Sequence, residues 1–115
     1  MHRLTVERET YATVVTAEGE LDAFVAPDLT ATLPDVADAS RLLVDLTNVS
    51  FMDSTALGLL VRMIREAGER GARVRVVLPL GAARRIFEIT TLDGVLPVSS
   101  SRAEALAELA ATASS

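Results

Sequence analysis

Residues 43–58 read LVDLTNVSFMDSTALG, and this stretch decides the fold of the chain. It begins inside an apolar run, Arg41 to Leu46, which is typical of a buried central strand, and a short polar loop follows. The pair Asp53-Ser54 then opens an apolar-periodic helix that we expect to run from Thr55 to about Arg70. The sequence therefore predicts that a strand leads into a helix, with a serine hydroxyl at the junction.

The position of Ser54 leaves two roles open. Backbone N–H groups at the start of a helix lack internal partners, and the helix dipole favours negative charge there. The Ser54 hydroxyl can therefore cap the helix or accept a phosphate. Asp53 can itself be the N-cap, which would free Ser54 for another role, and Thr55 offers a second hydroxyl at the same helix start.

The segment before this junction predicts a hairpin and a helix. Two β-prone runs near the N-terminus are separated by Arg8-Glu9-Thr10, and Gly19-Glu20-Leu21-Asp22 closes the second run. Pro27 suits the first turn of a helix. Pro34 should end or kink that helix, because proline lacks an N–H and its ring clashes with the preceding turn. We expect a short or broken helix over 27–38.

The segment after the junction alternates helices and strands. The helix after Ser54 should be ended by Gly71, and it should bury one stripe of residues: Leu57, Leu60, Val61, Ile64 and Gly68. Strands are expected over 73–78 and 95–98, with a helix through 86–89 between them. Ser101 and Glu104 have the form of a capping box, which opens a last helix with Leu106 and Leu109 inward and a frayed tail from about 112.

This order of elements predicts an α/β fold. We expect a single domain over residues 1–115, with a mixed, mostly parallel sheet, an antiparallel N-terminal hairpin and about four helices. Half of the residues are hydrophobic but only 3% are aromatic, so the core should be aliphatic. The net charge is −5 with no basic patch, which argues against nucleic acid or anionic membranes as direct partners. No membrane-spanning or signal pattern is seen, so we expect a cytoplasmic protein.

The composition also argues against catalysis. The chain has no Cys and no Lys, and its one histidine, His2, lies near an end that we expect to be loose. Ser54 therefore lacks a general base, and no phosphate-binding glycine motif is present. Asp22, Asp45 and Asp53 are scattered in a way more typical of loop and cap residues than of metal ligands. We expect no enzymatic activity, no metal and no cofactor.

The segment from Phe51 to Gly58, preceded by Val44-Asp45-Leu46, resembles the signature of STAS domains, and more narrowly that of bacterial anti-sigma factor antagonists. The Gly19–Asp22 turn, the strand over 73–78 and the run over 84–92 resemble the same family, so the resemblance covers about residues 3–110. It implies a protein-binding switch. Members bind a cognate anti-sigma factor that is also a serine kinase, and phosphorylation of the serine at the position of Ser54 ends the interaction.

The resemblance also implies the site residues and partners. Ser54 is the expected phosphoacceptor, a phosphatase is an expected further partner, and no small-molecule ligand is expected. The partner surface is expected to include Asp22, Asp53, Ser54 and Thr55. Leu59 and Met63 lie off the buried stripe of the helix, and this position predicts an adaptable apolar patch beside Ser54 that belongs to the same surface. Simpler roles stay open: Asp22 can be only a turn residue, and an adjoining helix can cover Met63, whereas Leu59 should be more exposed. The alternative function is a STAS module that is never phosphorylated and serves as a scaffold or binds a ligand.

Two positions depart from the family pattern. The common motif has glycine where this chain has Ala56, whose methyl group we expect to face the partner's backbone. Pro34 interrupts a helix that is usually continuous. Neither departure removes the acceptor hydroxyl.

Overall fold

The computed structural model describes residues 2–10, 12–78 and 98–113. One sheet has the strand order β1-β2-β3-β4-β5. Its strands are β1 (His2–Arg8), β2 (Thr13–Leu21), β3 (Arg41–Met52), β4 (Arg73–Val77) and β5 (Val98–Ser99). β1 and β2 are antiparallel, and every other neighbouring pair is parallel, which confirms the predicted mixed sheet.

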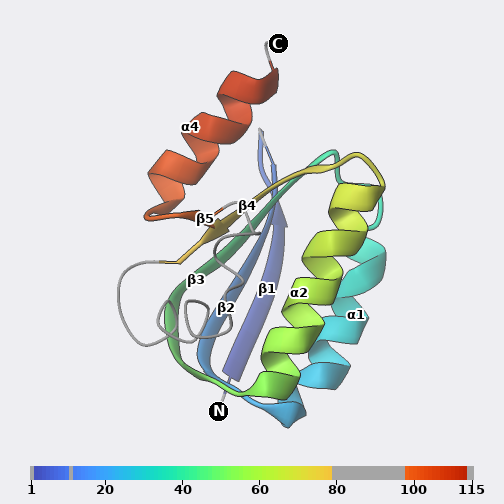
Figure 1. Cartoon of the computed structure of the whole chain (residues 1–115), viewed down its shortest axis with the longest axis vertical. Helices are drawn as coiled ribbons and strands as arrows, with labels where there is room; N and C mark the ends of the chain where they lie inside the picture. Colours follow the sequence, from blue (N-terminus) through green and yellow to red (C-terminus); the bar gives the residue numbers. More distant parts are fainter. Residues whose placement is uncertain (1, 11, 79–97, 114–115) are drawn as a thin grey trace.

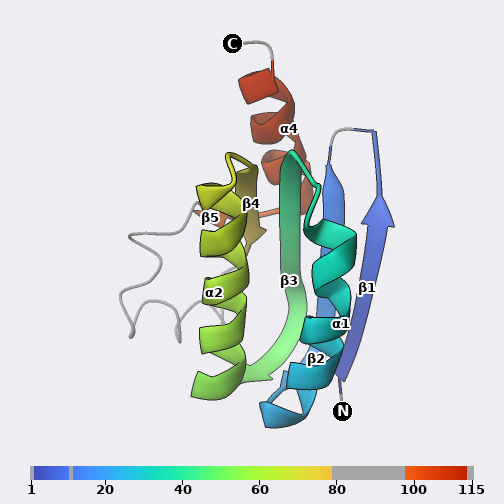
Figure 2. The same ribbon diagram turned by 90° about the vertical axis from the view of Figure 1, so that its right-hand side faces the viewer.

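Helices lie on both faces of this sheet. They are the 3-10 turn η1 (Ala23–Val25) and the α-helices α1 (Ala26–Val36), α2 (Ser54–Glu69) and α4 (Arg102–Ala113). Figures 1 and 2 show α1 and α2 side by side on one face and α4 on the other. The helix expected through 86–89, and residues 95–97 of the last expected strand, lie outside the described residues. Within the described ranges, no helix has both the length and the hydropathy of a membrane span.

The core has two parts because side chains alternate across each strand. In β3, Val44 belongs to the larger cluster beneath α1 and α2, whereas Leu43 belongs to the smaller cluster beneath α4. Asp45 shares the face of Leu43 and is buried, with 5% of its surface exposed. The predicted aliphatic core is confirmed, and it includes one carboxylate.

The N-terminal hairpin forms as predicted. The backbone N–H of Glu9 donates to the carbonyl of Ala12 at 2.8 Å, and the register runs from His2 opposite Gly19 to Arg8 opposite Thr13. The expectation of a loose end at His2 was wrong. His2 begins β1, and its ring contacts the Asp28 carboxylate of α1.

β3 is longer than the sequence pattern predicts. The expected polar loop, residues 47–50, continues the strand, which ends only at Met52. Val49 and Met52 are buried, and the extension pairs with the second half of β2. Two register shifts accompany this pairing, each with one extra residue in β3, and Gly19 of β2 at one of them has φ +84°. Long-range pairing with β2 therefore outweighs the local polarity of this segment.

Pro34 neither ends nor breaks the helix, contrary to expectation. α1 continues through it to Val36. Pro34 is exposed, while Leu29 and Val36 on either side are buried in the larger core. Since the helix ends two residues after Pro34, the missing hydrogen bond affects only its last turn, and packing holds the helix together.

α2 begins and ends as predicted, within one residue. Gly71, which follows the helix, has φ +88°, a conformation that glycine adopts readily. The predicted stripe was wrong at Gly68, which is exposed, and it was too narrow. Both the sheet and α1 pack against α2, so the buried set is wider: Ala56, Leu57, Leu60, Val61, Met63, Ile64 and Ala67.

α4 begins with the predicted serine cap. The backbone N–H of Glu104 donates to Ser101 Oγ at 3.1 Å. Leu109 is buried as expected, whereas Leu106 is only partly buried. Ala105 is completely buried in the smaller cluster.

Candidate functional site

The carboxyl ends of β2 and β3 lie side by side. Leu21 pairs with Met52, and the backbone N–H of Asp53 donates to the carbonyl of Leu21 at 2.9 Å. Asp22 and Asp53 are therefore the first residues beyond two adjacent strands, at one edge of the sheet. This is the edge from which α2 starts, low in Figure 1.

Asp53 caps α2. Its backbone is extended, and its Oδ1 accepts a hydrogen bond from the backbone N–H of Ala56 at 2.9 Å. Ser54 is consequently the first helical residue and not the cap. Its side chain is exposed, and no hydrogen bond among the described residues uses its hydroxyl. The prediction that Asp53 can itself be the N-cap of this helix is confirmed.

Thr55 and Asp22 differ in their exposure and in their hydrogen bonding. Thr55 is exposed, and its hydroxyl also makes no hydrogen bond among the described residues. Asp22 is half-buried, and its Oδ1 accepts a hydrogen bond from the backbone N–H of Phe24 at 3.0 Å. Asp22 therefore stabilises the turn at η1 and also lies at the same edge as Ser54.

Ala56 does not face a partner, contrary to expectation. Its side chain is completely buried in the larger core. The methyl group that distinguishes it from glycine packs inside the domain, because Ala56 lies on the inward face of α2.

Two exposed aromatic side chains near this edge were not expected from the sequence. Phe24 is 81% exposed in η1, two residues after Asp22, and Phe51 is 48% exposed in β3, two residues before Asp53. Alternation along an extended β3 would have placed Phe51 opposite to the buried Met52. Phe24 has no such signal, because it lies in an irregular turn.

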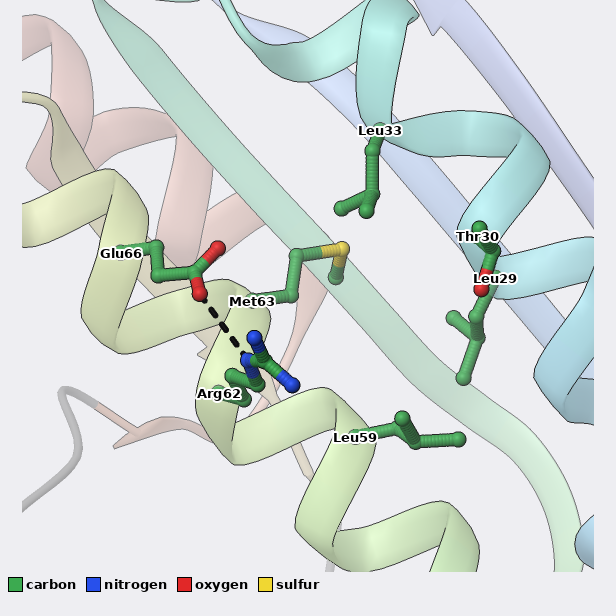
Figure 3. A pocket seen from close by; sticks show the side chains of 7 residues that line it. All are labelled: Leu29, Thr30, Leu33, Leu59, Arg62, Met63 and Glu66. Atoms are coloured by element: carbon green, nitrogen blue, oxygen red, sulfur yellow. Dashed lines mark hydrogen bonds and ion pairs between the residues drawn. The ribbon is translucent and has the colours of Figure 1, made fainter.

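Leu59 and Met63 line a groove between α1 and α2 with a volume of about 270 Å³. Figure 3 shows its walls. They are Leu29, Thr30 and Leu33 from α1 and Leu59, Arg62, Met63 and Glu66 from α2. Met63 is 4% exposed and Leu59 is only half-buried, so the expected contrast between them is present. Arg62 and Glu66 form an ion pair at 3.0 Å on the rim.

Asp45 lies away from this edge and belongs to a different network. Its carboxylate accepts hydrogen bonds from Thr47 and, at 2.8 Å, from Nε of Arg102. Burial raises the pKa of Asp45, but the hydrogen bonds from Thr47 and Arg102 outweigh burial and lower that pKa below 3.8. Asp45 therefore lies apart from Asp22 and Asp53, and no cluster of metal-ligating side chains forms among the described residues.

Comparisons with known proteins agree with this architecture. The STAS domain family matches residues 3–105. An anti-sigma-B factor antagonist of Listeria monocytogenes is 33% identical over 94 residues, covering 80% of this chain and 82% of the relative. One from Staphylococcus aureus is 37% identical over 82 residues, covering 70% and 76%. The crystal structure of an anti-sigma factor antagonist from Mycobacterium paratuberculosis superposes with a TM-score of 0.86 at 30% identity, covering 95% and 94%. The chain belongs to the STAS domain family.

Proposed function

We propose that this chain is an anti-sigma factor antagonist that is controlled by phosphorylation of Ser54. In the unmodified state it binds a cognate anti-sigma factor that is also a serine kinase. Transfer of phosphate to Ser54 ends that interaction, and a phosphatase restores it. The curated relatives are named anti-sigma-B factor antagonists, which supports the binding role, and the chain covers most of their length.

One observation carries the proposal. The hydroxyl of Ser54 is exposed at the first turn of α2 and is not needed to cap the helix, because Asp53 performs that task. A kinase can therefore reach it without opening the fold. Phosphorylation leaves the cap in place, and the N-terminal end of a helix favours a negative group.

Charge explains why the modification would end binding. A phosphate adds about −1.5 to −2 charges near neutral pH. It would join Asp53 and Asp22 at one edge of a chain whose net charge is already −5. A serine hydroxyl is buried against a partner at small cost, whereas a phosphate must lose its hydration and find a cationic partner. The switch is therefore local and requires no refolding.

The proposed partner surface extends from this edge along α2. It includes Asp22, Asp53, Ser54 and Thr55, and the exposed rings of Phe24 and Phe51 supply apolar contact area beside them. Leu59 follows Ser54 by five residues, or about 7.5 Å along the helix axis. The groove that it forms with Met63 can accept an apolar side chain of the anti-sigma factor.

The proposed role is binding in the cytoplasm and not catalysis. His2, the one imidazole in the chain, contacts Asp28 in the described structure, and the sequence contains neither Cys nor Lys. Ser54 therefore has none of the bases that activate nucleophilic serines. We expect no ATPase or esterase activity from the pure chain.

Affinity capture with three matched baits tests the proposal. Wild type and Ser54→Ala should retain the same anti-sigma factor from an extract of the source cells, and Ser54→Glu should not. The purified partner with ATP should then add one phosphate to wild type and none to Ser54→Ala, as measured by intact mass and peptide mapping. Phosphate on Thr55 alone, or equal capture by all three baits, would contradict the proposal. Equal capture without any phosphate transfer would instead support a scaffold role.

A further inference from the structure

Among the described residues, β1 forms a free edge of the sheet. All seven of its residues pair with β2 on one side, and β2 is its only neighbour in the strand order. Figure 2 shows β1 as the outermost strand, with α1 over one face. A strand with one unpaired edge presents a row of backbone donors and acceptors to any second strand.

The sequence of β1 is complementary to itself. It reads His2-Arg3-Leu4-Thr5-Val6-Glu7-Arg8. We propose that two copies of this chain form a dimer by antiparallel pairing of β1 with β1, centred on Thr5, so that the two sheets become continuous. This surface is separate from the carboxyl ends of β2 and β3, where Ser54 lies, and the inference does not depend on the proposed function.

Charge complementarity selects this register. When Thr5 faces Thr5, Arg3 of each copy lies directly opposite Glu7 of the second copy, and the pair occurs twice by symmetry. Directly opposite residues have Cβ atoms about 4.5–5.5 Å apart, which is within reach of an ion pair. Both side chains are exposed, and neither is in an ion pair among the described residues. Glu18 lies opposite Arg3 on β2, but the two are not in ion-pair contact.

Apolar contacts follow the same register. Leu4 would lie opposite Val6 of the second copy, on the face that α1 covers. Both side chains are only half-buried, and together with Asp28, Ala31, Thr32 and Asp35 they line an open hollow beside the edge. The second copy would cover part of this hollow.

At the ends of the strand, the same register determines which side chain faces His2. Arg8 of the second copy would come beside His2, whose ring contacts the carboxylate of Asp28. Registers centred on the residue before or after Thr5 lack the Arg3–Glu7 and Leu4–Val6 pairs. Centring on Leu4 places Arg3 opposite Thr5, and centring on Val6 places Leu4 opposite Arg8.

Sedimentation velocity over a concentration series tests the dimer. Wild type should associate reversibly, and Arg3→Glu or Glu7→Arg alone should weaken association about tenfold or more, because two attractive pairs become repulsive. The double variant Arg3→Glu/Glu7→Arg should recover it. An equimolar mixture of the two single variants should form a heterodimer, because one copy then carries two glutamates at these positions and faces two arginines on the other.

The matched control is Arg65→Glu, which changes the net charge as much as Arg3→Glu does, but on the exposed face of α2, and should leave association unchanged. Circular dichroism verifies that each variant is folded. A wild type that stays monomeric up to about 1 mM would overturn the proposal. A dimer that is insensitive to both single variants, or single variants that fail to associate with each other, would overturn it as well.

Discussion

Replacing Asp45 with asparagine should destabilise the domain by removing the anchor of α4. The Asp45 carboxylate accepts a hydrogen bond from the backbone N–H of Thr47 at 2.9 Å, and a second from the Thr47 hydroxyl. Its other oxygen accepts from Arg102 Nε at 2.8 Å. Asparagine keeps one oxygen for Thr47 but presents an NH₂ group and no charge to Arg102.

These contacts determine how much the free energy of unfolding should fall in Asp45→Asn. A hydrogen bond to a charged group contributes about 1.5–3 kcal/mol. The Arg102 side chain is 37% exposed and keeps Thr16 Oγ1 at 2.9 Å, so water and this neighbour compensate part of the loss. We expect the free energy of unfolding to fall by about 2 kcal/mol, and the Tm by about 8 °C for a domain of this size.

The difference in stability between wild type and Asp45→Asn should decrease as the pH falls. Hydrogen bonds in the folded state lower the pKa of Asp45 below 3.8 in spite of its burial. A carboxyl group with a lowered folded-state pKa contributes stability that is complete above its unfolded pKa and is lost as pH falls through the folded value. The difference between wild type and Asp45→Asn should therefore shrink as the pH falls below 3.8.

Urea unfolding followed by circular dichroism measures this difference near neutral pH and at about pH 2.5. Asp38→Asn is the matched control, because Asp38 is 71% exposed and its ion pair with Arg8 spans 3.5 Å. The control should change stability by less than about 0.5 kcal/mol. Equal stability of Asp45→Asn and wild type near neutral pH, or an unchanged difference in acid, would refute the reasoning.

Three further predictions concern the proposed partner surface. Asp53→Ala should lower the free energy of unfolding by about 1 kcal/mol through loss of the helix cap, and Asp53→Asn should restore most of it in thermal melts. Asp22→Ala should weaken partner binding or phosphorylation of Ser54 with a change in Tm of only a few degrees; a large fall in Tm with normal binding would make Asp22 purely structural. Leu59→Asp should weaken binding of the anti-sigma factor in titration calorimetry, whereas Arg65→Asp, on the exposed face of α2, should not.

Local sequence patterns predicted most of the fold because its local signals agree with one another. The hairpin, the start of α2 at Asp53 and its end before Gly71 each follow from turn or cap chemistry. The extension of β3 through residues 47–52 could not be predicted from the local sequence, because pairing with β2 determines it. The same holds for Pro34, which packing on either side keeps within α1.

Local sequence patterns, without the family resemblance, predicted the roles of site residues best where those residues are contiguous in the chain. Asp53 and Ser54 are neighbours, so their roles at the helix start could be proposed in advance. Outside this site, Arg102 lies 57 residues from Asp45, and nothing in either local pattern indicates their contact. The groove at Leu59 likewise requires the position of α1, which the sequence alone does not give.

The affinity of the purified anti-sigma factor for this chain, measured before and after phosphorylation of Ser54, tests the central claim most directly. Titration calorimetry should show tight binding of the unmodified chain and binding at least about a hundredfold weaker after one phosphate is added, which corresponds to a penalty of about 3 kcal/mol. Ser54→Ala, treated with the same kinase and ATP, should keep its affinity. Equal affinities of the two forms, or a loss of affinity that Ser54→Ala also suffers, would contradict the account.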